Sequence, residues 1–104
     1  MAVIVLSEPH EDGLPVSGGM MRGICEHAGT LSIDAHFLQR LSDAAEYGFI
    51  DLYECTFDEV EVFAAGIDGL ERETSQHSDT SPLLLQRLCS NAAAIREWNL
   101  RRKK

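Results

Sequence analysis

The distribution of apolar residues along the chain predicts two kinds of element. Residues 2–6 (AVIVL) are apolar throughout and β-branched at their centre, which predicts a short strand covered on both faces. Residues 49–55 (FIDLYEC) are rich in aromatic and β-branched residues and predict a second strand. A brief extended piece is expected near Leu31, where apolar and polar residues alternate.

Three longer segments show helical spacing. The first is expected to begin after Ser32 or Asp34 as N-cap and to end at Tyr47, where Gly48 can terminate it. The second follows Thr56, which forms a capping-box pattern (TFDE) before an apolar stripe. That stripe comprises Val60, Phe63, Ile67 and Leu70.

The last helix is predicted to start with Ser81 as cap and Pro82 at its first position. Its expected buried face comprises Leu85, Leu88, Ala92 and Ile95. A further short helix is expected at about residues 20–27. Residues 7–19 and 74–81 are rich in Gly, Pro, Ser, Thr and acidic residues and are predicted to be loops.

These elements predict a single compact domain over residues 1–104. Its class is α+β and helix-rich, with about three main helices and two or three short strands in a small sheet. The chain of 104 residues is long enough for one hydrophobic core. The basic residues at positions 100–104 are expected to form a frayed tail.

Charge is distributed unevenly along the chain, whose formal net charge is −8. Residues 30–80 hold twelve acidic residues against Arg40 and Arg72, whereas residues 81–104 hold six basic residues against Glu97. Such an acidic middle repels nucleic acid and attracts basic proteins. We therefore expect no nucleic-acid partner, and the lack of a long apolar run predicts no membrane association.

Three cysteines without a CxxC pair are typical of reduced thiols, so a cytoplasmic location is expected. The glycine-rich stretch at 13–23 (GLPVSGGMMRG) lacks the Lys and hydroxyl of a phosphate-binding P-loop. It also lacks the middle glycine of a dinucleotide loop, because Met20 occupies that place. We expect a mobile loop there and no cofactor.

Cys25 and His27 are the candidates for nucleophilic chemistry, since a Cys–His pair can hold a thiolate. At a spacing of two residues they point apart on a helix, so only a loop would join them. His10, His27 and His36 are the candidate metal ligands, although none shares the i,i+4 spacing of a helical metal site. A small enzyme or metal-binding protein with its site in residues 7–36 is thus the alternative function.

The main functional hypothesis rests on the acidic surface around residues 51–73. Its candidate partner-binding residues are Asp51, Glu54, Asp58, Glu61, Asp68 and Glu71. On the predicted helix, Asp58, Glu61 and Asp68 fall on the side away from the apolar stripe, and Glu71 flanks them. Asp51 and Glu54 precede the helix, and few cations balance these acids. The sequence therefore favours a protein-binding or regulatory module, or an inhibitor comparable in charge and size with toxin immunity proteins. A homodimer is also expected, because the apolar run at 2–6 has few partners in so short a chain.

Overall fold

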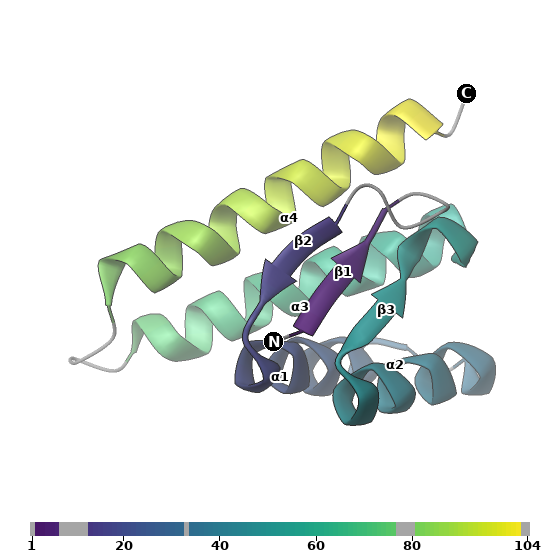
Figure 1. The fold of residues 1–104 in the computed structure, drawn as a ribbon, viewed down its shortest axis with the longest axis horizontal. Helices are drawn as coiled ribbons and strands as arrows, with labels where there is room; N and C mark the ends of the chain where they lie inside the picture. The colour runs from purple at the N-terminus through teal and green to yellow at the C-terminus, as the bar shows by residue number, and fades with distance from the viewer. Residues whose placement is uncertain (1, 7–12, 33, 77–80, 103–104) are drawn as a thin grey trace.

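The computed structural model describes residues 2–6, 13–32, 34–76 and 81–102. In chain order, its elements are β1 (Ala2–Val5), β2 (Gly13–Val16), α1 (Gly18–Gly29), α2 (Ala35–Tyr47), β3 (Phe49–Asp51), the 3-10 turn η1 (Leu52–Glu54), α3 (Phe57–Ser75) and α4 (Pro82–Arg102). Within the described residues, four helices accompany one small mixed sheet (Figure 1). The predicted α+β, helix-rich class is confirmed.

The sheet has the order β2-β1-β3, and β1 lies at its centre. Strand β1 pairs antiparallel with β2 and parallel with β3. Ile4 is opposite Leu14 on one side and Ile50 on the other, and this face of the sheet turns toward the core. Burial of Ala2, Ile4 and Val5 accounts for the apolar character of β1 at these three positions.

The opposite face of the sheet carries a row of three apolar residues, in which Val3 lies between Pro15 and Phe49. Pro15 is exposed, and Phe49 retains 47 % of its accessible surface. The expectation that residues 2–6 are covered on both faces is therefore wrong at this row. Sheets that contain antiparallel pairs tolerate one solvent-exposed face, and β1 pairs antiparallel with β2.

Pro15 is compatible with a strand only because of its place at the sheet edge. The backbone N–H of Val3 donates to the Gly48 carbonyl at 2.8 Å, so Val3 directs its polar backbone groups toward β3. Val3 and Pro15 are consequently a non-hydrogen-bonded pair, and β1 requires no N–H from Pro15. The missing N–H lies on the outer edge of β2, which is an edge of the sheet among the described residues, and it hinders addition of another strand.

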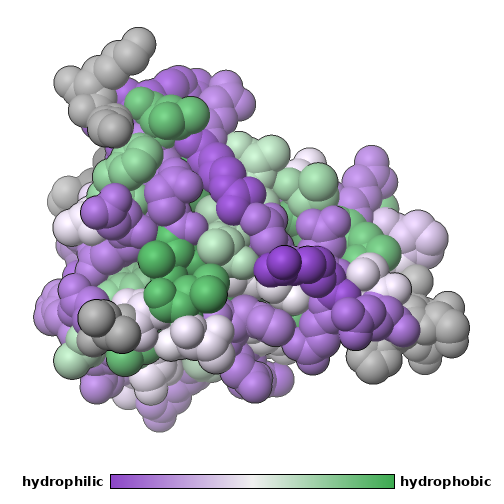
Figure 2. Space-filling model, turned by 180° about the vertical axis from the view of Figure 1, so that it is seen from behind, coloured by the Kyte–Doolittle hydropathy of each residue, from purple (hydrophilic) through white to green (hydrophobic). Residues whose placement is uncertain are grey.

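Helix α3 is the central helix of the fold. Helices α1 and α4 both pack on it, while α2 packs on α1 and β3. In Figure 1, α4 runs along the upper side of the molecule and α1 and α2 lie below the sheet. The predicted stripe of α3 is buried at Val60, Phe63 and Ile67, and that of α4 is buried at Leu88 and Ile95. Seen from behind, hydrophilic side chains cover most of the surface around a hydrophobic patch (Figure 2).

Local capping signals fix where the helices begin and end. Asp34 accepts hydrogen bonds from the backbone N–H groups of His36 and Phe37, which confirms it as the N-cap of α2. Gly48 ends α2 with a φ of 85°, a left-handed conformation that favours glycine. Thr56 and Glu59 form both hydrogen bonds of the predicted capping box at α3.

Several predicted boundaries are wrong. Within the expected loop 7–19, residues 13–16 form β2 and α1 starts at Gly18, while residues 7–12 lie outside the described part. The expected strand over 49–55 ends at Asp51 and continues as η1. Residues 30–32 contain no strand, so the extended piece near Leu31 is not formed there.

The two expected C-terminal irregular segments also differ from the structure. Helix α3 continues to Ser75, so the expected loop over 74–81 is shorter at its start, and residues 77–80 lie outside the described part. The tail expected at 100–104 is helical at residues 100–102, which belong to α4, while residues 103–104 lie outside the described part. Among the residues described, no helix combines the length and apolar character needed to span a bilayer.

Candidate functional site

The residues expected to support thiol chemistry are on α1. Cys25 is 6 % exposed, and burial raises the pKa of its thiol to about 11. Such a thiol is protonated near neutral pH and is a poor nucleophile. His27 is two residues away on the same helix, and its Nε2 atom pairs with Glu73 Oε2 of α3. The structure therefore directs His27 to Glu73 and does not join it to Cys25.

The candidate metal ligands are dispersed in the described part of the chain. His36 is exposed in the first turn of α2, and His27 is paired with Glu73. No group of three His, Cys, Asp or Glu residues suited to a metal ion is present among the described residues. His10 lies outside them.

Two of the candidate partner-binding acids face α4. Asp68 Oδ2 forms an ion pair with Arg96 Nη2 at 2.6 Å, and this hydrogen bond raises the pKa of the Arg96 guanidinium. Glu61 Oε1 accepts a hydrogen bond from Asn99 Nδ2 at 3.2 Å. Both acids are half-buried beside α4. The expectation that they lie on an open side of α3 is therefore wrong, because α4 packs along it.

The other four candidate acids have different surroundings. Glu54 is exposed and pairs with Arg40 of α2 at 3.3 Å. Asp58 is exposed in the first turn of α3, whereas Asp51 and Glu71 are half-buried. The acids are thus distributed over two regions, one around η1 and the start of α3 and one along the α3–α4 contact.

Arg102 folds back toward η1, but it binds neutral acceptors. Its guanidinium donates to the backbone carbonyls of Leu52, Tyr53 and Cys55 at 3.3, 3.4 and 2.5 Å. The guanidinium also lies 4.5 Å from the centre of the Trp98 ring. Desolvation lowers the pKa of Arg102, although a guanidinium stays charged at neutral pH. Arg102 therefore satisfies the carbonyl groups at the end of η1, and it forms no ion pair with an acid in the described part of the chain.

Asn99 is a buried polar residue on the otherwise apolar stripe of α4 and is 0 % exposed. Its amide donates to the Phe57 carbonyl at 3.0 Å and to Glu61, and its oxygen accepts from Arg102. Sequence reasoning missed this contact. The available signal was the spacing of Asn99 four residues after the buried Ile95, which places a polar side chain on the packed face.

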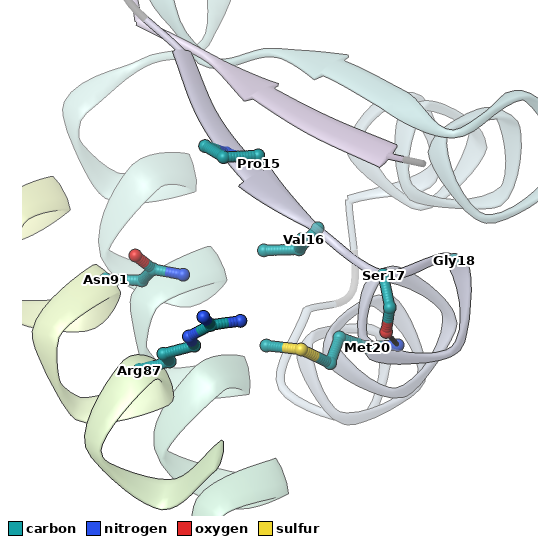
Figure 3. Close-up of a pocket in the computed structure, with 7 residues that line it drawn as sticks. All are labelled: Pro15, Val16, Ser17, Gly18, Met20, Arg87 and Asn91. Carbon is teal, nitrogen blue, oxygen red and sulfur yellow. Dashed lines mark hydrogen bonds between the residues drawn. The ribbon is translucent and has the colours of Figure 1, made fainter. Parts of the chain in front are cut away.

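A cavity lies between the β2–α1 junction and α4 and has a volume of about 690 Å³ (Figure 3). Its walls comprise Pro15, Val16, Ser17, Gly18, Met20, Arg87 and Asn91. The glycine-rich stretch at 13–23 thus forms one wall as a strand, a cap and a helix. Ser17 is the N-cap of α1 and accepts a hydrogen bond from the Met20 N–H at 3.1 Å. Sequence reasoning missed the cavity because its second wall is distant in the chain.

The fold and these contacts define a small α+β domain with two groups of acidic residues and a cavity lined by apolar and polar residues and the cation Arg87. Comparison of the chain with protein-family models, curated proteins and solved structures finds no match.

Proposed function

We propose that the protein is a small binding module for a partner protein with a cationic surface. The receiving surface is the acidic segment, residues 43–58, which runs from the end of α2 through β3 and η1 to the first turn of α3. A regulatory or inhibitory role toward a basic protein is the form of binding that charge and size favour. This segment differs from the expected acidic surface at 51–73. It leaves out residues 59–73, where Glu61 and Asp68 face α4, and it adds residues 43–50.

The observation that carries this proposal is how positive charge is placed around the acidic segment. The segment contains five Asp or Glu residues and no Lys or Arg. Arg40 pairs with Glu54, but Arg102 binds carbonyl oxygens. Glu46 and Asp58 are exposed and have no ion pair within the described residues. Surplus negative charge of this kind accelerates association with a cationic protein and favours it over other partners.

Exposed aromatic side chains within the acidic segment support a protein partner in particular. Tyr47 and Phe49 retain 68 % and 47 % of their accessible surface. Tyrosine is enriched among the residues that dominate binding energy at interfaces, and aromatic rings accept the guanidinium of arginine over their faces. Carboxylates beside exposed rings are therefore complementary to an arginine-rich protein surface.

A matched pair of double variants tests the proposal. Glu46→Gln/Asp58→Asn removes two exposed charges from the acidic segment, and Glu26→Gln/Glu97→Gln removes two exposed charges elsewhere. Exposed ion pairs contribute ~0.2–1 kcal/mol each, so the first variant should weaken binding by about 2- to 30-fold. Circular dichroism of both variants checks that they are folded.

The measurement is affinity capture of partners at low and high salt, followed by titration of each captured protein with the three forms. We expect a basic protein that wild type and the Glu26→Gln/Glu97→Gln control bind alike, with affinity that falls as salt rises. Equal binding by all three forms, or binding that salt does not alter, would contradict the proposal.

The predicted homodimer stays a prediction. The open row Pro15–Val3–Phe49 is a surface that a second copy could cover, whereas Pro15 disfavours pairing through the β2 edge. Sedimentation at micromolar concentration separates monomer from dimer, and a purely monomeric profile would remove this expectation.

A further inference from the structure

The cavity between β2, α1 and α4 has the size and lining of a small-molecule site. Its volume of about 690 Å³ falls within the range of roughly 300–1,000 Å³ that such sites occupy. Helix α4 packs on α3, and the cavity is the space between α4 and the β2–α1 junction. The cavity is separate from the acidic segment and shares no residue with it.

The two walls of the cavity differ in chemistry. Pro15, Val16 and Met20 supply an apolar wall, and methionine adapts to ligands of irregular shape. Arg87 and Asn91 supply the polar wall. They are four residues apart on α4, and both project toward Val16 and Met20 (Figure 3). A ligand in this space therefore meets apolar carbon on one side and two hydrogen-bond donors on the other.

Arg87 differs from the arginines that hold the fold together. Arg40 and Arg96 form ion pairs and Arg102 donates to backbone carbonyls, whereas Arg87 has no such partner within the described residues. Among the described residues that line the cavity, none is acidic. A guanidinium facing an apolar wall without a carboxylate is complementary to an anion that has an apolar body.

We propose that this cavity binds a small carboxylic acid with an apolar chain or ring. The carboxylate accepts hydrogen bonds from Arg87 and Asn91, and the apolar body packs against Val16 and Met20. A guanidinium binds a carboxylate through two parallel hydrogen bonds, which sets the orientation of the ligand. This site is independent of the proposed protein partner.

The test is a titration of ¹⁵N-labelled protein with octanoate, observed by two-dimensional NMR. Octanol carries the same apolar chain without the charge, and inorganic phosphate carries charge without the chain. We expect octanoate to shift the signals of Val16, Ser17 and the Asn91 side-chain amide. We expect octanol and phosphate each to bind at least about tenfold more weakly, because hydrogen bonds to charged groups are the stronger class.

Arg87→Gln should weaken octanoate binding at least about tenfold, whereas the matched variant Arg72→Gln, on the exposed end of α3, should bind as wild type does. Both arginines are exposed, so both variants are expected to fold. The proposal is overturned if octanoate shifts no cavity signal at millimolar concentration. It is equally overturned if octanol or phosphate binds as well as octanoate, or if Arg87→Gln binds unchanged. The Glu46→Gln/Asp58→Asn variant should retain octanoate binding, which separates this result from the fate of the protein-partner proposal.

Discussion

Replacing Gly66 by alanine would place a methyl group at a close contact between α1 and α3. A Cβ atom at Gly66 would lie 2.8 Å from the Ala28 Cβ atom, 2.8 Å from the Ile24 carbonyl oxygen and 2.9 Å from the Ala28 backbone nitrogen. Two of these three atoms belong to the backbone of α1, so no side-chain rotation can relieve the contact. The two helices would have to move apart, which would loosen the core around Phe63 and Ile67.

Two effects of opposite sign determine the change in the free energy of unfolding. Alanine favours the helical conformation over glycine by ~1 kcal/mol. Overpacking a close contact costs ~1–3 kcal/mol, and three simultaneous contacts, two of them with the α1 backbone, favour the upper part of that range. We therefore expect Gly66→Ala to lower the free energy of unfolding by about 1–2 kcal/mol. For a domain of this length, that change lowers the melting temperature by about 4 °C or more.

Urea unfolding observed by circular dichroism and by the fluorescence of Trp98 measures this effect. Gly29→Ala is the matched control, because a Cβ atom there meets only Leu38 Cδ2 at 3.7 Å, an ordinary contact distance. The control should be as stable as wild type or up to about 1 kcal/mol more stable. If Gly66→Ala proved at least as stable as wild type with an unchanged urea dependence, the close approach of α1 and α3 would be refuted.

Three further predictions concern the end of α4, the start of α3 and the buried thiols. Arg102→Gln should lower the free energy of unfolding by about 1.5–3 kcal/mol, because it removes charged hydrogen bonds to three carbonyls. The control Arg101→Gln, at an exposed position, should change this free energy by less than about 0.5 kcal/mol. Equal effects of the two variants in urea unfolding would contradict the role of Arg102. Thr56→Ala should cost about 1 kcal/mol by removing the capping box, and an unchanged urea midpoint would refute this. Burial raises the pKa of both Cys25 and Cys55 from 9.0 to about 11, so the folded state holds these protons more tightly than the unfolded state does. Their contribution to stability is therefore full below pH 9 and is lost as the pH rises from 9 to 11. Urea unfolding across this range should show the decrease, and the two thiols should resist iodoacetamide at pH 8; rapid alkylation in the folded state would contradict their burial.

Local signals in the sequence were sufficient to locate most helices. The capping box at Thr56, the glycine at position 48 and the stripe of α4 each depend on residues within one or two turns of each other. The apolar character of residues 2–5 correctly indicated a strand. Such signals act within a few residues, so they can be recognised without knowing which elements pack together.

The features that the sequence concealed depend on contacts between distant segments. Residues 13–16 (GLPV) have no strand pattern of their own and form β2 only because β1 supplies the pairing edge. The cavity arises where the start of α1 meets Arg87 and Asn91, about 70 residues later. In the same way, the tail appeared free because nothing near Arg102 in sequence reveals the carbonyl groups of η1. Residue propensities and the spacing of apolar residues do not predict such contacts between distant segments.

The packing of α4 explains why the basic residues at the end of the chain do not neutralise most of the acidic residues in its middle. Packing of α4 on α3 brings Arg96 to Asp68, which neutralises one carboxylate directly. In the following turns of α4 the contacts are no longer ion pairs. Asn99 binds Glu61 as a neutral amide, and Arg102 donates to backbone oxygens. These contacts satisfy hydrogen-bonding groups that burial would otherwise leave unpaired, but they do not neutralise the acids of the acidic segment. Stability of the α3–α4 contact and a surplus of negative charge around η1 are therefore compatible, and that surplus is what a cationic partner would recognise.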